Sequence, residues 1–171
     1  MSLTLTSQLL AELDRESERT RRALQQVPDG KQDWKPHEKS MAFGYLAQLV
    51  ATMPSWVALM IARDELDIAP PGGSKQPSAP MATRADLLAA ADKAVSDARA
   101  ALERTTDETL MTPWRLLAGG HVVAEAPRHV MIRDAINHLA HHRGQMTVYL
   151  RLMGATVPAL YGPSADDKRF A

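Results

Sequence analysis

Apolar residues recur at intervals of three and four positions in four stretches of this chain, and this repeat most restricts the folds open to it. The stretches cover residues 4–26, 40–63, 85–104 and 127–153. Such spacing places one apolar stripe along an α-helix, and the stripe is stable only when it packs against another element. Four amphipathic helices therefore predict an all-α fold, and specifically a four-helix bundle.

Residues that end or start helices separate these stretches. The sequence PDG at 28–30 ends the first helix, and Thr83 with Asp86 resembles a capping box at the start of the third. Pro54 interrupts the second stretch. Because proline removes one backbone donor from the helix, we expect a kink near Val50.

Three further segments lack the helical repeat. The segment 69–80 contains four prolines and two glycines in twelve residues, which predicts a long exposed loop. Because only two helices precede it, we interpret this loop as a crossover within one domain that spans residues 1–171. Residues 114–125 contain β-branched runs around a Gly-Gly pair and predict a short hairpin or an irregular arm. The tail 155–171 is expected to pack as coil.

The composition excludes several classes of protein. Lys and Arg number 20, as do Asp and Glu, so the formal net charge is zero and no nucleic-acid partner is expected. The chain has no cysteine, which excludes disulfides, thiolate metal sites and cysteine nucleophiles. No apolar run reaches the roughly 18 residues of a membrane-spanning helix, and the N-terminus lacks a signal-peptide pattern. We therefore expect a soluble, cytoplasmic protein without a membrane partner.

The last predicted helix has a histidine-rich face. His138 and His142 are four residues apart, so their imidazoles lie on one side of the helix at a spacing that can hold a metal ion. His141 lies about 100° away around the helix, whereas Gln145 and Tyr149 share the face of the pair. A catalytic zinc site normally has three protein ligands, and the residue pattern does not identify a third.

Several motifs carry a resemblance to a known family. The last helix contains NHLAHHRGQ at 137–145 and YLRLMG at 149–154, and the tail continues with Pro158 and YGPSADD at 161–167. Upstream, the chain contains DWKPHEKSM at 33–41 and MPSW at 53–56. Together these motifs extend over roughly the whole chain. They resemble the motifs of the DinB-like (damage-inducible protein DinB) superfamily.

This resemblance implies a four-helix bundle with up-down-down-up topology, a long crossover, and a homodimer. It also implies a divalent metal, often nickel or zinc, held by one histidine of the second helix and by a pair that maps onto His138 and His142. Some members are thiol-dependent enzymes that use bacillithiol, mycothiol or glutathione. Here the second helix reads LAQLVA at 46–51 where relatives read LAxHVA, so Leu49 occupies the ligand position. We therefore expect the metal to be absent or weakly bound.

Other residues are candidates for a pocket beside this face. We expect Leu49, Trp56, Gln145 and Tyr149 to line it. The amide of Gln145 can hydrogen-bond a ligand or a histidine, and the hydroxyl of Tyr149 can bond a histidine and close the cavity.

Two charged residues receive structural interpretations. Arg143 lies about 100° from His142 around the helix, which favours a salt bridge within the bundle or the dimer. Glu16 belongs to the charge run of the first helix and is expected on its solvent-facing side.

Three functions remain open at this point. The first is a DinB-like protein of unassigned activity, with a degenerate metal site and a cavity for a small apolar ligand. The second is a metal-dependent thiol transferase or hydrolase that uses His138 and His142 as metal ligands. The third is a dimer that acts through protein contacts without catalysis.

Overall fold

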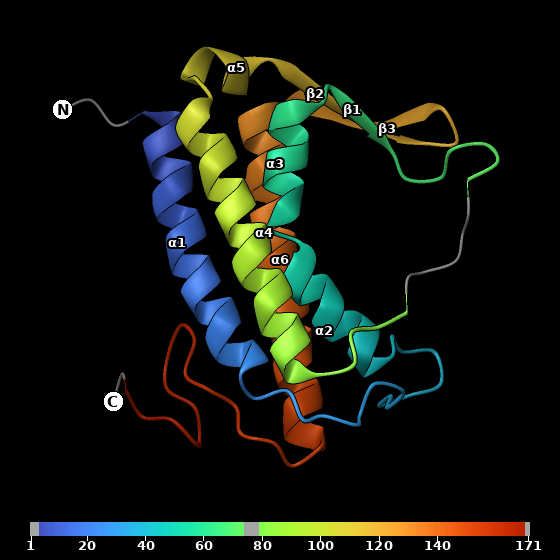
Figure 1. The fold of residues 1–171 in the computed structure, drawn as a ribbon, viewed down its shortest axis with the longest axis vertical. Coiled ribbons are helices and arrows are strands. Elements are labelled where there is room, and N and C mark those ends of the chain that lie inside the picture. The colour runs from blue at the N-terminus through green and yellow to red at the C-terminus, as the bar shows by residue number, and fades with distance from the viewer. Residues whose placement is uncertain (1–3, 74–78, 170–171) are drawn as a thin grey trace.

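The computed structural model describes residues 4–73 and 79–169 and is mostly helical (Figure 1). The described chain also contains a small three-stranded sheet, so the fold is not all-α as predicted, although a hairpin in this region was one of the two expectations. Its helices are α1 (Leu5–Leu24), α2 (Phe43–Thr52), α3 (Ser55–Ala62), α4 (Arg84–Arg104), α5 (Asp107–Met111) and α6 (Arg128–Leu152). Its strands are β1 (Glu65–Asp67), β2 (Pro113–Ala118) and β3 (His121–Pro127).

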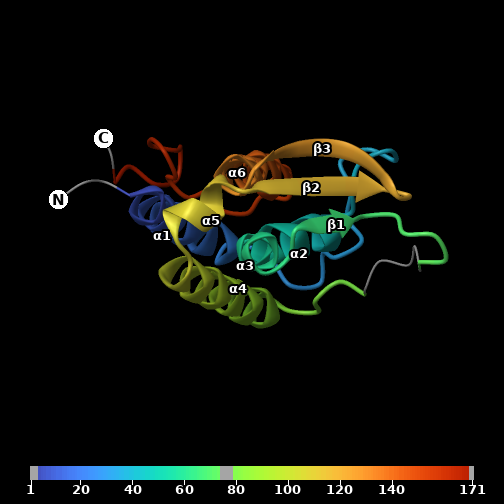
Figure 2. The same ribbon diagram turned by 90° about the horizontal axis from the view of Figure 1, so that it is seen from above.

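The long helices pack side by side. In Figures 1 and 2, α1, α4, α6 and the α2–α3 segment lie alongside one another. The colours of Figure 1 show that α1 and α6 run in one direction and that α2–α3 and α4 run in the other. Thr4 caps α1, and Thr83 forms the predicted capping box with Asp86 at the start of α4. These caps satisfy backbone donors at the first turn of each helix.

The core consists of two clusters of buried apolar side chains. We call the first the α2-side core; its members include Phe43, Leu46, Val50, Leu139 and Met146. We call the second the sheet-side core; its members include Leu9, Leu13, Leu102, Trp114 and Ile132. Trp56 packs against both clusters and therefore connects them.

The predicted break at Pro54 is present. The helix ends at Thr52 and resumes at Ser55, with a bend of 52° between α2 and α3. The break lies a few residues after the position expected for the kink, because Met53 still donates to the carbonyl of Leu49. Among the described residues, no single helix is long and apolar enough to span a membrane, and only this bent pair reaches that length and apolarity together.

The sheet has the order β1-β2-β3. Strands β2 and β3 form the antiparallel hairpin expected for this region, and β1 pairs with β2 in parallel. The carboxylate of Asp67 accepts hydrogen bonds from the backbone amides of Gly119 (3.0 Å) and Gly120 (2.7 Å), so the end of β1 holds the hairpin turn. Both glycines have positive φ angles, of 62° and 81°, which a residue with a side chain rarely adopts.

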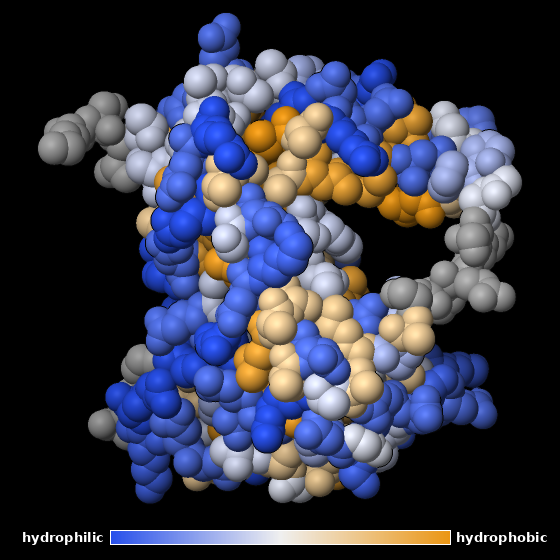
Figure 3. All heavy atoms as spheres, in the orientation of Figure 1, coloured by the Kyte–Doolittle hydropathy of each residue, from blue (hydrophilic) through white to orange (hydrophobic). Residues whose placement is uncertain are grey.

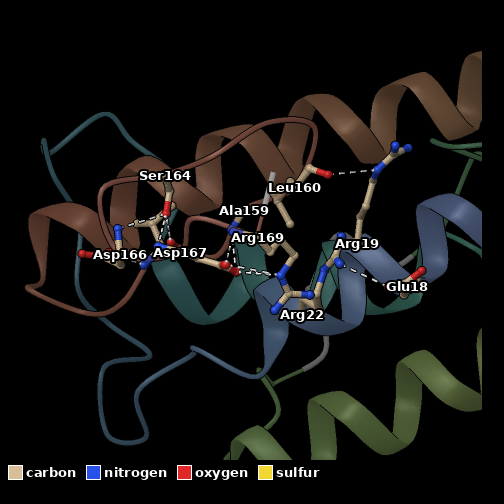
Figure 4. Close-up of polar contacts among 10 residues, drawn as sticks. Glu18, Arg19, Arg22, Ala159, Leu160, Ser164, Asp166, Asp167 and Arg169 are labelled. Atoms are coloured by element: carbon tan, nitrogen blue, oxygen red, sulfur yellow. Dashed lines mark hydrogen bonds and ion pairs between the residues drawn. The ribbon is translucent and has the colours of Figure 1, made fainter. Parts of the chain in front are cut away.

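Segments outside the helices and sheet follow the predictions where they are described. Residues 69–73 and 79–83 are coil, as expected for the crossover, and residues 74–78 lie outside the described chain. The tail is also coil and packs near α1 and α6 (Figure 4). Arg19 donates to the carbonyl of Leu160, and Asp167 accepts from the backbone amide of Ala159.

Arg143 is fully buried on α6, with 0% exposure. It donates to the carbonyl of Glu16 (3.0 Å) and to the hydroxyl of Thr20 (2.9 Å), and it forms an ion pair with the Glu16 carboxylate. Tyr161 accepts from Arg143 and donates to Glu16 (2.7 Å). The salt bridge predicted for Arg143 within the bundle is therefore confirmed.

The expectation that Glu16 faces solvent is wrong, since its exposure is 8%. A buried guanidinium needs a counter-charge, and α1 supplies it from the border of its apolar stripe. This network connects α1, α6 and the tail.

Replacement of Arg143 by methionine is expected to lower the free energy of unfolding by about 3 kcal/mol, because Glu16 is left buried without its main counter-charge. Arg133→Met is the matched control, since Arg133 also lies on α6 and pairs with a glutamate of α1, Glu12, but is 51% exposed. The control should lose less than about 1 kcal/mol. Urea unfolding measures both values, and equal losses would contradict a special role for the buried pair.

The same network predicts how stability depends on pH. Burial alone would raise the pKa of Glu16, because it favours the neutral carboxyl group. Hydrogen bonds from Tyr161, Arg143 and Arg19, together with the positive charge of Arg143, outweigh this effect. The pKa of Glu16 is therefore lowered below its ordinary value of 4.5. A lowered carboxyl pKa adds stability that is complete above the ordinary value and is lost as the pH falls through the folded-state pKa. The stability gap between the native chain and Glu16→Gln should therefore narrow in acid. Urea midpoints from neutral pH to about pH 3 test this, and a gap that widened in acid would refute it.

Candidate functional site

Helix α6 brings three histidines together on one part of its surface. The ring centroids of His138 and His142 are 4.6 Å apart, and their planes are tilted by 37°. His141 lies 5.2 Å from His142 and 6.5 Å from His138. The predicted pair is thus adjacent, because residues four apart stand one above the other on a helix.

Gln145 links two of these rings. Its amide oxygen lies 2.8 Å from Nδ1 of His142, and its amide nitrogen lies 3.0 Å from Nε2 of His141. With this arrangement Nδ1 of His142 carries the proton and Nε2 of His141 accepts. The sequence-based expectation that Gln145 bonds a histidine is confirmed. The bond also supplies a partner to His142, which is only 9% exposed.

His138 occupies a different environment. The indole ring of Trp56 meets its imidazole edge to face, with the centroids 5.8 Å apart. Burial lowers the pKa of His138, and the charges of His142 and His141 lower it further. His138 is therefore largely neutral at neutral pH, and its imidazole can donate or accept one hydrogen bond.

A cavity of about 300 Å³ opens beside His138. It lies between α3, the sheet and α6, and Figure 3 shows apolar residues gathered along the side of the projecting sheet that faces this hollow. Its walls are almost entirely apolar: Trp56, Leu59, Met60, Leu66, Ile68, Trp114, Leu116, Met131 and Ala135. The ionisable groups that line it are His138 and Asp134.

The predicted pocket residues are divided between two places. Trp56 lines the cavity with His138, whereas Leu49 packs against the α2-side core. The hydroxyl of Tyr149 donates to the carbonyl of Met41 at 3.3 Å, and no bond between it and a histidine is present among the described residues. Tyr149 is seven residues beyond His142, or about 10 Å along the helix, so it cannot close a cavity at the other end of the face.

Sequence reasoning missed the other half of the cavity. Met131 and Ala135 precede His138 on the same helical face, and that spacing was a usable signal. Leu66, Leu116 and Trp114 reach the cavity only because β1 pairs with β2 across about fifty residues of chain. No local pattern indicates such a pairing.

The donor set does not match a three-histidine metal site. Two imidazoles are adjacent, and the bond from Nδ1 of His142 to Gln145 leaves the Nε2 atom of that ring as the possible ligand. Leu49, however, supplies no lone pair for a third ligand. Within residues 4–73 and 79–169, no group of three His, Cys, Asp or Glu side chains is arranged to hold a metal ion.

The sequence profile of the DinB family matches residues 1–169. The chain belongs to the DinB family. A relative in sequence is the uncharacterised protein YrdA of Bacillus subtilis (strain 168), which is 33% identical over 90 residues. That match covers 52% of this chain and 51% of YrdA, so the chain spans about half the length of this relative.

Solved DinB-like structures show the same fold. A protein from Bacillus cereus ATCC 10987 superposes with a TM-score of 0.69 over 90% of this chain and 95% of its own, at 23% identity. The protein YjoA of Bacillus subtilis gives a TM-score of 0.65 over 87% of this chain and 94% of its own, at 22% identity. A third, from Exiguobacterium sibiricum 255-15, gives 0.64 over 90% and 95% of the two chains, at 17% identity. Identities this low support the fold alone.

Leu49→His is expected to tighten the binding of zinc and nickel about tenfold or more, because it adds an imidazole at the position where the resemblance implies the third ligand. Metal titration of the native chain and the variant measures the change. Two controls isolate the cause: Leu49→Gln adds polarity without a good ligand, and His142→Ala in the Leu49→His background should remove the gain. Equal affinities in native chain and variant would refute this account of Leu49.

Proposed function

We propose that this DinB protein is an up-down-down-up helical bundle that binds one small, largely apolar molecule in the cavity between α3, the sheet and α6. The observation that carries the proposal is the cavity itself, which has a volume of about 300 Å³ and walls that are almost wholly apolar. Pockets that bind small molecules are typically apolar, with few polar groups that set the orientation of the ligand.

The size of the cavity supports a ligand rather than a packing defect. A dry engineered cavity of about 150 Å³ is large enough to bind benzene. A cavity of about 300 Å³ between two tryptophans therefore has room for a small molecule.

The polar groups at the cavity suit orientation of a ligand. His138 is held by the edge of Trp56 and is largely neutral, so its imidazole can accept or donate one hydrogen bond to a bound molecule. Asp134 lies one helical turn before it, at the same cavity. The ligand's apolar body would lie against Trp56 and Trp114, with its polar end at this side.

A second candidate function is metal-dependent chemistry at His138 and His142, as a thiol transferase or hydrolase. The 4.6 Å separation of the two rings favours it. Such a site needs a further ligand from outside the described protein groups, so we propose that this chain holds a divalent metal weakly. We favour ligand binding over metal-dependent chemistry because the cavity is formed by residues that are present, whereas the metal site lacks a third protein ligand among the described residues.

Ala135→Leu is expected to fill part of the cavity and to weaken the binding of 1-octanol about tenfold or more, because the added methyl groups take the ligand's space. Calorimetric titration measures the affinity, and burial of apolar surface should give a negative heat-capacity change. Ala140→Leu is the matched control, since Ala140 is half-buried on the same helix and does not line the cavity.

Two results would decide against the proposal. One is the absence of octanol binding to the native chain; the other is equal affinity in the Ala135→Leu and Ala140→Leu variants. If overpacking unfolds Ala135→Leu, Met131→Trp tests the same point at a half-buried lining position.

A further inference from the structure

The geometry points to a cationic amphiphile as the ligand class: a protonated primary amine on a compact alkyl or aryl body. We infer that the ammonium group pairs with the Asp134 carboxylate at the rim, and that the apolar body fills the cavity between Trp56 and Trp114. This inference rests on the proposed function, because it assigns the ligand of the same cavity.

Asp134 is a carboxylate without a protein counter-charge. Among the described residues, it takes part in no hydrogen bond, ion pair or ring contact. Its neighbour Arg133 is engaged elsewhere, since it pairs with Glu12 at 3.1 Å. His138, one turn further along α6, makes ring contacts with Trp56 and His142 and no hydrogen bond to Asp134.

Three arginines near the cavity walls have other carboxylate partners. Arg128, at the start of α6, pairs with Asp64. Arg115, on the cavity's strand β2, pairs with Glu65 at 2.7 Å. With Arg133 also paired, the described protein offers Asp134 no cation of its own. A negative charge at the edge of an apolar cavity favours a ligand that brings the positive charge.

The walls of the cavity suit such a ligand as well. The faces of tryptophan rings attract cations and also pack against hydrocarbon. Trp114 is 1% exposed, whereas Asp134 is exposed on α6, so the cavity extends from a buried wall to a charged rim. An anionic ligand would be repelled by the Asp134 carboxylate at the rim, and the walls of the cavity would offer it few hydrogen-bond donors.

Three ligands of one chain length separate the effect of charge from the effect of apolar burial. Octylammonium, 1-octanol and octanoate carry one positive charge, no charge and one negative charge at neutral pH. Calorimetric titration of the full chain should rank them in that order of affinity. We expect octylammonium to bind at least about tenfold more tightly than octanoate.

Asp134→Asn tests the carboxylate directly. The variant should lose about fivefold or more of its affinity for octylammonium and keep its affinity for 1-octanol, because the amide has the same shape without the charge. Asp33→Asn is the matched control. It removes one exposed carboxylate from the connection between α1 and α2, at the end of the helices away from the sheet (Figure 1). Asp134→Glu should keep the preference.

The outcomes distinguish this inference from the proposed function. If 1-octanol does not bind, the cavity is not a ligand site and both ideas fail. If 1-octanol binds but octylammonium is not preferred, the inferred ligand class is wrong, but the proposed ligand site is not refuted. The same conclusion follows if Asp134→Asn behaves like Asp33→Asn. Preference for octylammonium that is lost in Asp134→Asn and kept in Asp134→Glu supports the assignment.

Discussion

The side chain of Arg128 joins the three elements that form the candidate site. It is the first residue of α6 and is only 5% exposed. Its guanidinium donates to the carbonyl of Met60 in α3 at 2.8 Å and to that of Pro113 in β2, and it pairs with Asp64 just before β1. A buried guanidinium has to satisfy its donors, so these elements are held in one arrangement. The cavity lies between these elements, and the buried guanidinium helps to hold its walls together.

A second constraint places the aromatic residue that connects the cavity to the histidines. Pro54 cannot donate a helical hydrogen bond, so the second helix breaks and α3 leaves at 52° to α2. Trp56 follows two residues later, where its ring touches both core clusters and meets His138. The site therefore forms where the backbone changes direction. In a straight helix the side chain of Trp56 would have a different position relative to His138.

The limits of sequence prediction follow from the range of each interaction. The helices could be predicted because the spacing of apolar residues is a local pattern. The helix break at Pro54 could be predicted because the loss of one backbone donor acts within a single helical turn. Strand β1 is three residues long and exists through its pairing with β2, about fifty residues away. Glu16 belongs to a charge run that usually faces solvent, and its burial depends on Arg143, which is 127 residues further along the chain. The lining residues Leu66, Trp114 and Leu116 were not predicted for the same reason, because they reach the cavity through this long-range strand pairing.

The histidines of α6 also have contacts within the fold that do not involve a metal. His142 is nearly buried, and a buried imidazole needs a hydrogen-bond partner, which Gln145 supplies one turn later. His138 forms part of the cavity wall against Trp56. Each retained residue therefore has a contact that favours keeping it in the fold, whether or not a third imidazole is present. Leucine at position 49 packs against the α2-side core, and its side chain has no lone pair to offer a metal. The chemistry left to this face is then that of the His138 imidazole beside an apolar cavity, with the Asp134 carboxylate one turn away.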